Sequence, residues 1–408
     1  MRKVPKLRFK EFSEEIQNIN FESIIKKITY GPRFNSENYS SDGNVKTIRG
    51  TDIDSNGEIK YEQIPLAKLD IETINSHKLN DGDLVIITTA NCGNVGVFEH
   101  QKIDFIASAY AVKVELLNKR SNYFLKYFFQ TNISKKEVDK YLRTGTLSNL
   151  PASDIKKIKI NIPSLQEQEK IANFLSSVDK KISLTEEKLE LFRDYKKEVM
   201  QKIFSQELRF KDSKGNDYPE WEKKRLEEIA QYRRGSFPQP YGLKEWYDEI
   251  NGNPFIQVYD VDDNFKLKDS TKNKISKKAE KYSIYAEKGT IIITLQGSIG
   301  RVAKMQYSGF IDRTILIFER YFFPINVDFF KYSLFLIFDE EKRKAPGGII
   351  KTITKEVLSS FIIQLPTLEE QEKIADFLSA IDSKIESIEK ELDGLKEFKR
   401  GLLQQMFV

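Results

Sequence analysis

Few side chains in this chain are suited to catalysis. Among 408 residues there is one cysteine, Cys92, and there are two histidines, His77 and His100. Cys92 and His100 could in principle form a thiol–imidazole pair, but we expect Cys92 to be a small loop residue. Together these three residues are too few for a structural zinc site, which needs four ligands. The nucleotide loops GxxxxGK[ST] and strand–GxGxxG are also missing, so the sequence contains no complete catalytic constellation.

Two acidic motifs imitate metal or nuclease sites. Residues 52–57 (DIDSNG) resemble the start of a calcium-binding EF-hand loop, but the twelfth position is Gln63 instead of glutamate. In the equivalent stretch, 260–265, the glycine is replaced by Phe265. We interpret both stretches as turns that end strands. The EQEK text at 167–170 resembles part of a nuclease carboxylate set, but helix capping explains it better.

Composition is typical of a folded protein with a mild basic excess. Hydrophobic residues make up 39%, charged residues 31% and aromatic residues 12% of the chain, and the net charge is +5. A single cysteine excludes an intramolecular disulfide, which fits a reducing cytoplasm. The basic start is not followed by an apolar core, so we predict no signal peptide, and no apolar run is long enough for a bilayer. The positive charge is compatible with a polyanionic partner but does not establish one.

The elements that position these residues occur twice. Residues 163–182 read PSLQEQEKIANFLSSVDKKI, and 366–385 read PTLEEQEKIADFLSAIDSKI, an offset of 203 residues. The text LRFK also recurs, at 7–10 and 208–211. The chain is therefore predicted to be two tandem copies of a globular half followed by a long helix. The predicted boundaries are 1–162, 163–205, 206–365 and 366–408.

Each globular half is predicted to be a mixed α+β domain. Short β-branched runs at 84–88 and 291–294 indicate buried strands, each followed by a glycine-containing loop. The other matched features are runs ending in acidic turns (45–59 and 254–267), a further strand (106–116 and 311–320), a helix (123–129 and 328–334) and a loop (143–150 and 344–353).

The two long helices are predicted to pair as a coiled coil. Each starts with a capping box, Ser164-x-x-Glu167 or Thr367-x-x-Glu370. Seam positions then alternate by four and three residues. In the first helix they are Ile171, Leu175, Val178, Ile182, Thr185, Leu189, Phe192, Lys196, Val199 and Ile203, and in the second Ile374, Leu378, Ile381, Ile385, Ile388, Leu392, Leu395, Lys399, Leu402 and Met406.

Only one globular half lies between the helices, so antiparallel pairing is favoured. It would place one half at each end of a rod, with pseudo-two-fold symmetry. Lys196 and Lys399 would then lie near the acidic first turn of the opposite helix, at Glu369, Glu370 and Glu372 or at Glu167 and Glu169. We hypothesise that these lysines fix the register of the pair, as buried polar groups can. The alternative is that the seam is simply open there.

The duplicated motif P-x-L-x-EQ-x-KIA-x-FL and the stretch EWEKKRLEEIA at 220–230 resemble the specificity subunits of type I restriction–modification systems, a bacterial defence. The resemblance covers the whole chain. It implies an α+β architecture of two mixed α/β target recognition domains separated by two long helices that form an antiparallel coiled coil. It also implies a cytoplasmic, non-catalytic subunit that binds double-stranded DNA and reads a bipartite target.

The same resemblance implies partners that carry the chemistry. Two methyltransferase subunits would dock on the helices, which set the spacer between half-sites, and motor/endonuclease subunits would join them. AdoMet, ATP and Mg are expected on those partners, with no cofactor and no metal on this chain. The competing interpretations are a non-DNA coiled-coil adaptor with two binding heads and an enzyme whose site is not evident.

DNA readout needs Arg, Asn, Gln and hydroxyl side chains on loops, with Lys and Arg on phosphates. The matched loops provide such residues, although each could instead be a solvated loop side chain. Gly93 and Gly96, and Gly347 and Gly348, could let the backbone approach phosphate. The candidate DNA-binding residues are Arg33, Arg49, Thr89, Asn91, Asn94, Arg143, Thr144, Thr146 and Asn149 in the first half, and Arg233, Arg234, Gln257, Tyr259, Gln296, Ser298, Arg301, Arg313, Lys344, Lys351 and Thr352 in the second.

Overall fold

The computed structural model describes residues 4–143, 145–344 and 355–408. The chain divides into two compact units. Unit 1 is Met1–Glu187 with Lys390–Val408, and unit 2 is Lys188–Glu389, so each unit contains one globular half and parts of both long helices. Thr144, Lys351 and Thr352 of the candidate contacts, and Gly347 and Gly348, lie outside the described residues.

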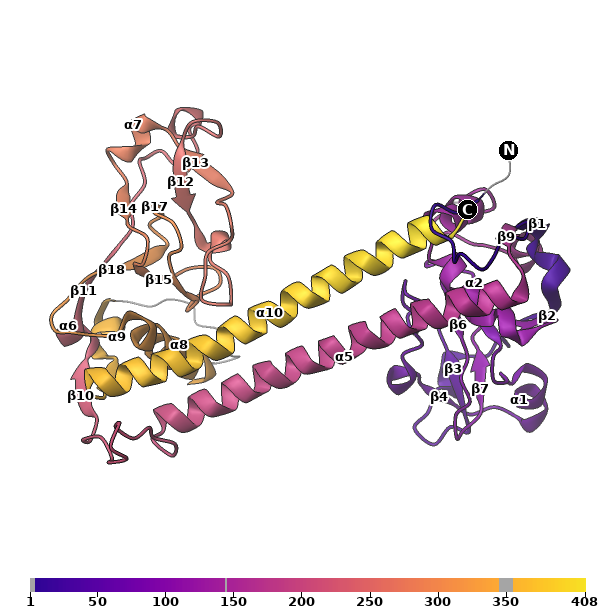
Figure 1. The fold of residues 1–408 in the computed structure, drawn as a ribbon, viewed down its shortest axis with the longest axis horizontal. Coiled ribbons are helices and arrows are strands. Elements are labelled where there is room, and N and C mark those ends of the chain that lie inside the picture. Colours follow the sequence, from indigo (N-terminus) through magenta and orange to yellow (C-terminus); the bar gives the residue numbers. More distant parts are fainter. Residues whose placement is uncertain (1–3, 144, 345–354) are drawn as a thin grey trace. The chain divides into compact units, whose positions relative to one another are not determined.

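Unit 1 contains three small sheets (Figure 1). The four-stranded antiparallel sheet has the order β2 (Ile25–Tyr30), β8 (Ala111–Leu116), β5 (Leu84–Ile87) and β6 (Val95–Val97). The three-stranded sheet has the order β4 (Leu66–Ala67), β3 (Val45–Ile48) and β7 (Phe105–Ala107), and its β3–β7 pair is parallel. The strand β1 (Gln17–Asn20) pairs with β9 (Lys159–Ile162). The short helices are α1 (Ile71–His77), α2 (Asn122–Phe129), α3 (Asn132–Asp139) and α4 (Ala152–Ile155).

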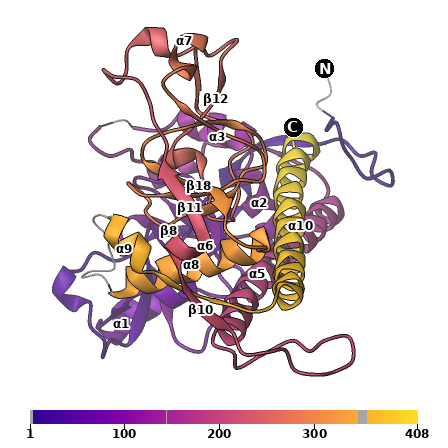
Figure 2. The same ribbon diagram turned by 90° about the vertical axis from the view of Figure 1, so that its left-hand side faces the viewer.

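Unit 2 repeats this plan (Figure 2). One sheet has the order β11 (Ala230–Arg234), β18 (Ile315–Tyr321), β15 (Ile291–Thr294) and β16 (Val302–Lys304). The other has the order β13 (Asn273–Ile275), β12 (Asn253–Ile256), β17 (Gly309–Ile311) and β14 (Ile284–Ala286), with β12 and β17 parallel. The strand β10 (Glu222–Arg225) pairs with β19 (Ile362–Leu365). The helices are α6 (Leu226–Ile229), α7 (Lys277–Glu280), α8 (Val327–Lys344) and α9 (Lys355–Ser360).

The single strand predicted at 106–116 is wrong. The chain forms β7 in one sheet and β8 in another, and a turn closed by Ala111 N–H donating to Ser108 O (3.0 Å) joins them. The stretch predicted at 311–320 is divided in the same way, with Ile315 N–H donating to Asp312 O at 3.0 Å. Most of β7, β8, β17 and β18 is buried. Apolar side chains therefore continue through the turn, and the hydrophobic pattern does not reveal it.

The long helices are α5 (Leu165–Phe204) and α10 (Leu368–Met406). In unit 1, Asp179 pairs with Lys399 (2.7 Å) and Glu186 with Lys396 (2.7 Å). Partner numbers fall along α10 as they rise along α5, so the helices run antiparallel there, as predicted. The same direction holds in unit 2, where ion pairs join Arg193 to Glu389 and Lys196 to Asp382.

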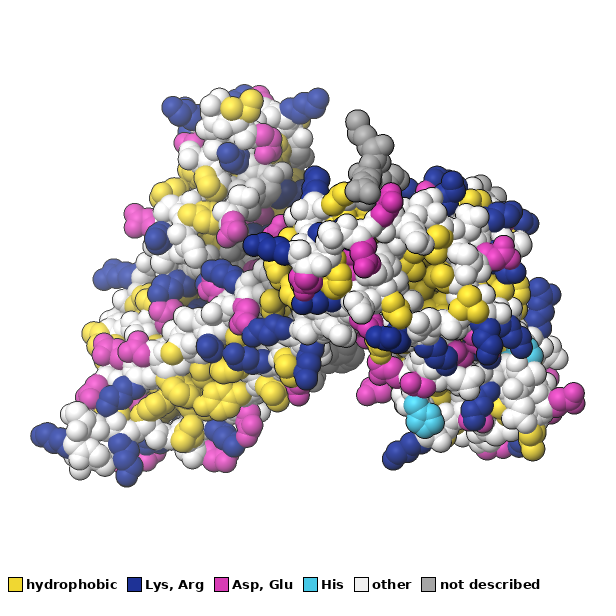
Figure 3. All heavy atoms as spheres, turned by 45° about the vertical axis from the view of Figure 1, so that its right-hand side comes forward, with side chains coloured by type: hydrophobic (Ala, Val, Ile, Leu, Met, Phe, Trp, Pro, Cys, Tyr) yellow, Lys and Arg dark blue, Asp and Glu magenta, His cyan; other side chains and the backbone are white. Residues whose placement is uncertain are grey.

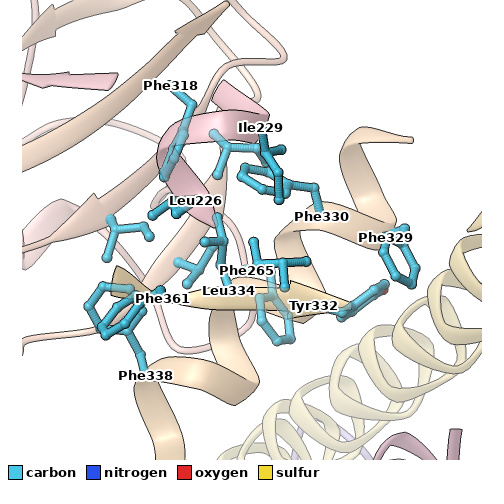
Figure 4. Close-up of a cluster of buried hydrophobic side chains, with 14 of the residues drawn as sticks. Leu226, Ile229, Phe265, Phe318, Phe329, Phe330, Tyr332, Leu334, Phe338 and Phe361 are labelled. Carbon is cyan, nitrogen blue, oxygen red and sulfur yellow. The ribbon is translucent and has the colours of Figure 1, made fainter. Parts of the chain in front are cut away.

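The helix seams are part of the core of each unit. In unit 1, Ile171, Leu175 and Leu402 are buried in one cluster with α2 and the four-stranded sheet, and the rings of Phe124 and Phe407 are 5.2 Å apart. In unit 2, seam residues of both helices share a core with α6, α8 and β18. Figure 4 shows the side chains that α6, α8 and β18 contribute to this core. Burying these apolar side chains fixes each globular half on its helix pair.

The predicted capping boxes are only partly correct. The Thr367 hydroxyl accepts from Glu370 N–H (3.4 Å), but the buried Glu370 carboxylate binds Arg209 (2.9 and 3.2 Å). Glu167 likewise holds Arg8, at 2.7 and 2.8 Å. The two arginines belong to the LRFK segments at 7–10 and 208–211. This repeated text therefore ties the start of each sequence repeat to the opening of the long helix in the same repeat. An arginine competes successfully for the glutamate because a bidentate ion pair is stronger than a backbone hydrogen bond.

The lysine partners also differ from the prediction. Lys399 and Lys196 bind Asp179 and Asp382, well inside the opposite helices, instead of the first-turn glutamates. Tyr127 of α2 donates to Asp179 (2.8 Å), and Tyr332 of α8 donates to Asp382 (2.6 Å). Each lysine–aspartate–tyrosine triad therefore joins both long helices to the globular half of its unit. We name these triads the polar locks.

Across the described residues, none of the helices has both the length and the apolarity needed to cross a membrane.

Candidate nucleic-acid interface

Loops from the four-stranded and the three-stranded sheet of unit 1 meet at one edge. The strands β2, β3, β5 and β7 end there and β8 begins there. Ser108 N–H donates to Ile48 O (2.9 Å) and Thr88 N–H donates to Tyr110 O (2.9 Å), which holds the loops side by side. We define the edge loops of unit 1 as 31–39, 49–52, 88–94 and 108–110.

Unit 2 builds the same edge with the same backbone contacts. Asp312 N–H donates to Ile256 O (3.0 Å) and Leu295 N–H donates to Thr314 O (2.8 Å). The edge loops of unit 2 are 235–241, 257–260, 295–301 and 312–314.

A glycine is required where the chain leaves the first strand of each edge. A Cβ on Gly31 would lie 1.9 Å from Ala107 O, and one on Gly235 would lie 2.2 Å from Ile311 O. Both approaches are impossible for another residue without a backbone shift. The two edges are therefore constructed on one backbone frame, although their side chains differ.

The frame is clearest after β3 and β12. Arg49 N–H donates to Asp52 Oδ2 (2.8 Å), and Gln257 N–H donates to Asp260 Oδ2 (2.9 Å). Both aspartates are almost fully buried. Asp52 also binds the Arg49 guanidinium through Nε and Nη2, both at 3.0 Å. The predicted contact Arg49 therefore lies at the edge in a fixed orientation.

The loop at residues 143–150 extends the unit 1 edge. Its backbone pairs with the 88–94 loop, since Ala90 N–H donates to Ser148 O (3.0 Å) and Leu150 N–H donates to Thr88 O (2.8 Å). The structure thus brings together the predicted residues Thr89, Asn91, Arg143, Thr146 and Asn149, of which all but the half-buried Thr89 are exposed.

Three predicted residues of unit 1 need separate comment. Arg143 pairs with Asp154 at 3.1 Å. The half-buried Asn94 donates to Ile53 O (3.2 Å) and so supports the turn beneath the edge. Arg33 is exposed in an edge loop. Arg33 and Arg143 therefore keep exposed cationic groups, whereas the Asn94 side chain has a structural role.

Gln257 is not available as predicted for direct readout. It is 8% exposed, its Nε2 donates to the Tyr241 hydroxyl (2.6 Å), and its Oε1 accepts from Asn273 (2.7 Å) and from the Tyr259 hydroxyl. The amide therefore positions two phenols at the edge. Burial raises the pKa of Tyr241, and raises that of Tyr259 to about 12, so both hydroxyls stay protonated at physiological pH, with their hydrogens donated to Asp312 (3.0 Å) and to Gln257.

Most of the other predicted residues of unit 2 that the structure describes lie on the edge loops or at the end of β11. Gln296 and Ser298 are exposed on the β15–β16 loop, and the Arg313 guanidinium lies 5.7 Å from the centre of the Tyr241 ring. Arg301 forms an ion pair with Asp263 (2.7 Å). Arg233 and Arg234 are exposed at the end of β11, and Lys344 ends α8, where it pairs with Glu340 (2.8 Å) and Glu341 (3.1 Å).

Sequence reasoning missed the exposed tyrosines of the edges. Tyr39 and Tyr110 are 38% and 63% exposed in unit 1, and Tyr241 is 42% exposed in unit 2. Aromatic faces and hydroxyls are suited to nucleotides. The sequence signal that could have identified them is a tyrosine in a predicted loop, where no apolar periodicity assigns the ring to the core.

Charged side chains of both signs are interspersed on the faces drawn in Figure 3. Figure 3 shows Lys and Arg side chains among Asp and Glu on the visible faces of both units. A polyanion would therefore be recognised by local donors at the edge loops, with a modest contribution from the general field.

The residues that imitate catalytic and metal sites in the sequence have structural roles. Asp54 Oδ1 accepts from the backbone N–H groups of Asn56 (2.8 Å) and Glu58 (2.9 Å), which forms the turn that we expected. Cys92 Sγ donates to Thr88 O (3.1 Å), and burial raises the pKa of its thiol. Within the described ranges, His, Cys, Asp and Glu side chains form no group of three or more that could hold a metal ion.

Comparison with known proteins gives one consistent family. The model described as the type I restriction modification DNA specificity domain matches residues 13–191 and 218–397. A putative type I restriction enzyme MjaX specificity subunit from Methanocaldococcus jannaschii is 27% identical over an alignment of 361 residues that covers 81% of this chain and 79% of that protein. The type I restriction enzyme MjaVIII specificity subunit from the same organism is 25% identical over an alignment of 341 residues that covers 80% of this chain and 78% of that protein.

Solved structures agree on the fold. The type I restriction–modification S subunit from M. genitalium has a TM-score of 0.61 at 17% identity, covering 100% of this chain and 99% of that chain. A chain from a structure on complex assembly and conformational transition of the type I R-M system has a TM-score of 0.57 at 19% identity, covering 97% and 99%.

Proposed function

Because the chain belongs to the type I restriction–modification DNA specificity family, we propose that it is the non-catalytic subunit that selects the DNA target. Each unit binds one half of a bipartite double-stranded site through its edge loops. The observation that carries this proposal is the pair of matched edges: one backbone frame, repeated, with different polar side chains on it. Such a design suits two readers of different sequences on equivalent supports.

Contacts within the edges divide by chemistry. Exposed cations such as Arg33 and Arg143 suit phosphates, which position a protein on DNA without specifying sequence. A fixed donor such as the Arg49 guanidinium suits base edges in the major groove.

The helix pair offers the same surface once in each unit, which supports the docking of two identical methyltransferase subunits, with motor/endonuclease subunits joining them. AdoMet, ATP and Mg would be bound by those partners in the cytoplasm, and this chain would contribute no catalytic group.

Binding measurements on the full chain with its methyltransferase test the proposal. The target is first defined by mapping genomic adenine methylation in cells that express both. Affinity for a duplex with that site should exceed affinity for random DNA, and both should fall as salt rises because bound cations release counterions from phosphates. Equal affinity for all duplexes, or binding that ignores salt, would favour a protein adaptor. Methyl transfer by this chain alone would contradict its non-catalytic role.

A further inference from the structure

The strongest difference between the two edges is the residue directly after β3 and β12. Both positions use the same backbone contact to a buried aspartate, Asp52 or Asp260. In unit 1 the residue is Arg49, whose side chain is 42% exposed, and in unit 2 it is the buried Gln257. A position whose frame is constant while its side chain changes from cation to amide is a candidate for setting specificity.

Asp52 holds the guanidinium in one orientation. Its side chain is 0% exposed, and its oxygens accept from Arg49 N–H, Nε and Nη2 and from Gln63 Nε2 at 2.9 Å. A buried carboxylate with this many donors cannot move without leaving a charge unpaired. The arginine is therefore fixed before any ligand arrives, which lowers the entropy cost of using it.

The Arg49 side chain remains partly exposed although Asp52 binds it. Asp52 binds the Nε–Nη2 side, and Nη2 also reaches Gln63 O at a long 3.4 Å. The third nitrogen, Nη1, takes no part in these contacts, and the side chain as a whole is 42% exposed. Tyr39, which interacts electrostatically with both Arg49 and Tyr110, adds an exposed aromatic neighbour. An arginine held side-on by a carboxylate and still partly exposed presents the donor pair that matches guanine O6 and N7.

Unit 2 has the same backbone arrangement around its buried aspartate, but without this arginine. Asp260 accepts from the backbone N–H groups of Gln257 and Lys272, both at 2.9 Å. The glutamine side chain turns inward to Tyr241 and Tyr259. In unit 2 the Lys272 N–H thus takes the place that the guanidinium has in unit 1, so the aspartate is satisfied without an arginine.

We propose that Arg49 reads a guanine in the half-site bound by unit 1. This inference rests on the proposed DNA-binding function and adds one base identity and one residue to it.

The test uses the full chain in complex with its methyltransferase and duplexes that carry each single base-pair change of the mapped target. The variants are Arg49→Lys, which keeps the charge, and Arg49→Gln, which copies unit 2. Arg120→Lys is the matched control, because Arg120 also forms a bidentate carboxylate pair, with Glu169, and follows the opposite end of β8.

We expect the unchanged complex to lose about tenfold in affinity when one particular G·C pair is altered. Both Arg49 variants should lose this preference at that pair alone, and methylation in cells expressing Arg49→Gln should extend to sites without the guanine. Arg120→Lys should keep it. If the unchanged complex prefers its target but the Arg49 variants retain every base preference, the inference is wrong and the proposed function stands. If the unchanged complex has no sequence preference, the proposed function fails as well.

Discussion

Replacing Lys196 with methionine should destabilise unit 2 by breaking its polar lock. The lysine on α5 forms an ion pair with Asp382 on α10, and Tyr332 of α8 donates to the same carboxylate at 2.6 Å. The Lys196 side chain is 14% exposed and that of Asp382 is 24% exposed. Methionine retains most of the aliphatic stem, so the change removes the charge and little packing.

The magnitude follows from this partial burial. Removing one member of a fully buried ion pair costs about 3–5 kcal/mol, and an exposed pair contributes about 0–1 kcal/mol. Asp382 retains Tyr332 and some water, so we expect about 2 kcal/mol. Lys196 Nζ also lies 4.3 Å from the centre of the Phe265 ring, and losing this cation–π contact adds about 0.5–1 kcal/mol.

Urea unfolding followed by tryptophan fluorescence measures the effect. The only two tryptophans of the sequence, Trp221 and Trp246, both lie buried in unit 2. The unfolding midpoint should fall while the slope with urea stays unchanged. In a double-mutant cycle with Asp382→Leu, the pair should lose about 1–2 kcal/mol less than the sum of the single changes.

The other lock provides an independent repeat. Lys399 Nζ lies 2.7 Å from Asp179 Oδ1 in unit 1, and Lys399→Met with Asp179→Leu can be followed by circular dichroism. Additive losses in both cycles would refute the reasoning, because they would mean that the lysines are solvated at an open seam.

Two further perturbations test the frame. Gly235→Ala should lower the free energy of unfolding in urea by about 1–3 kcal/mol, because its Cβ would lie 2.2 Å from a carbonyl oxygen. Gly394→Ala has nothing within 4 Å of its Cβ and should stabilise α10 by about 0.5–1 kcal/mol. Equal effects of the two substitutions would contradict this reasoning. Burial alone would raise the pKa of Asp328, but hydrogen bonds and charges from Lys304 and Lys331 outweigh it and hold the pKa below its usual value. A lowered folded-state pKa contributes stability above the unfolded value of about 4 that is lost as pH falls through the folded value. Asp328→Asn should therefore flatten the acid side of a profile of urea midpoint against pH, and an unchanged profile would argue against the ion pairs.

Local sequence signals predicted the parts of the fold whose cause is local. The seam spacing and the prolines before Ser164 and Thr367 predicted the long helices, which the structure confirms. The β-branched runs at 84–88 and 291–294 correspond to the buried strands β5 and β15.

The remaining features depend on contacts between distant segments. The turn at Ser108–Tyr110 interrupts a continuous apolar run, so only the pairing of β7 and β8 with different partners reveals it. The inward orientation of Gln257 depends on Asn273, which follows it in the chain by 16 residues and belongs to β13. A list of loop residues cannot separate such a positioning residue from an exposed one.

The identity between the two helix openings has a structural cause. Glu167 and Glu370 bind the LRFK arginines, and the Gln168 and Gln371 amides donate to the preceding proline carbonyls at 2.8 and 2.9 Å. All four side chains are nearly buried, so replacing any of them would leave charged or polar partners unpaired.

The edge loops are under no such constraint. Exposed side chains there, such as Asn91 and Gln296, can change without leaving a buried group unpaired, whereas Arg49 is an exception because its guanidinium binds the buried Asp52. Stability and specificity are therefore carried by different residues of the same unit. A substitution of an exposed edge side chain should alter the recognised bases while unfolding stays nearly unchanged. A substitution in a polar lock should lower the unfolding midpoint in either unit regardless of the DNA it reads.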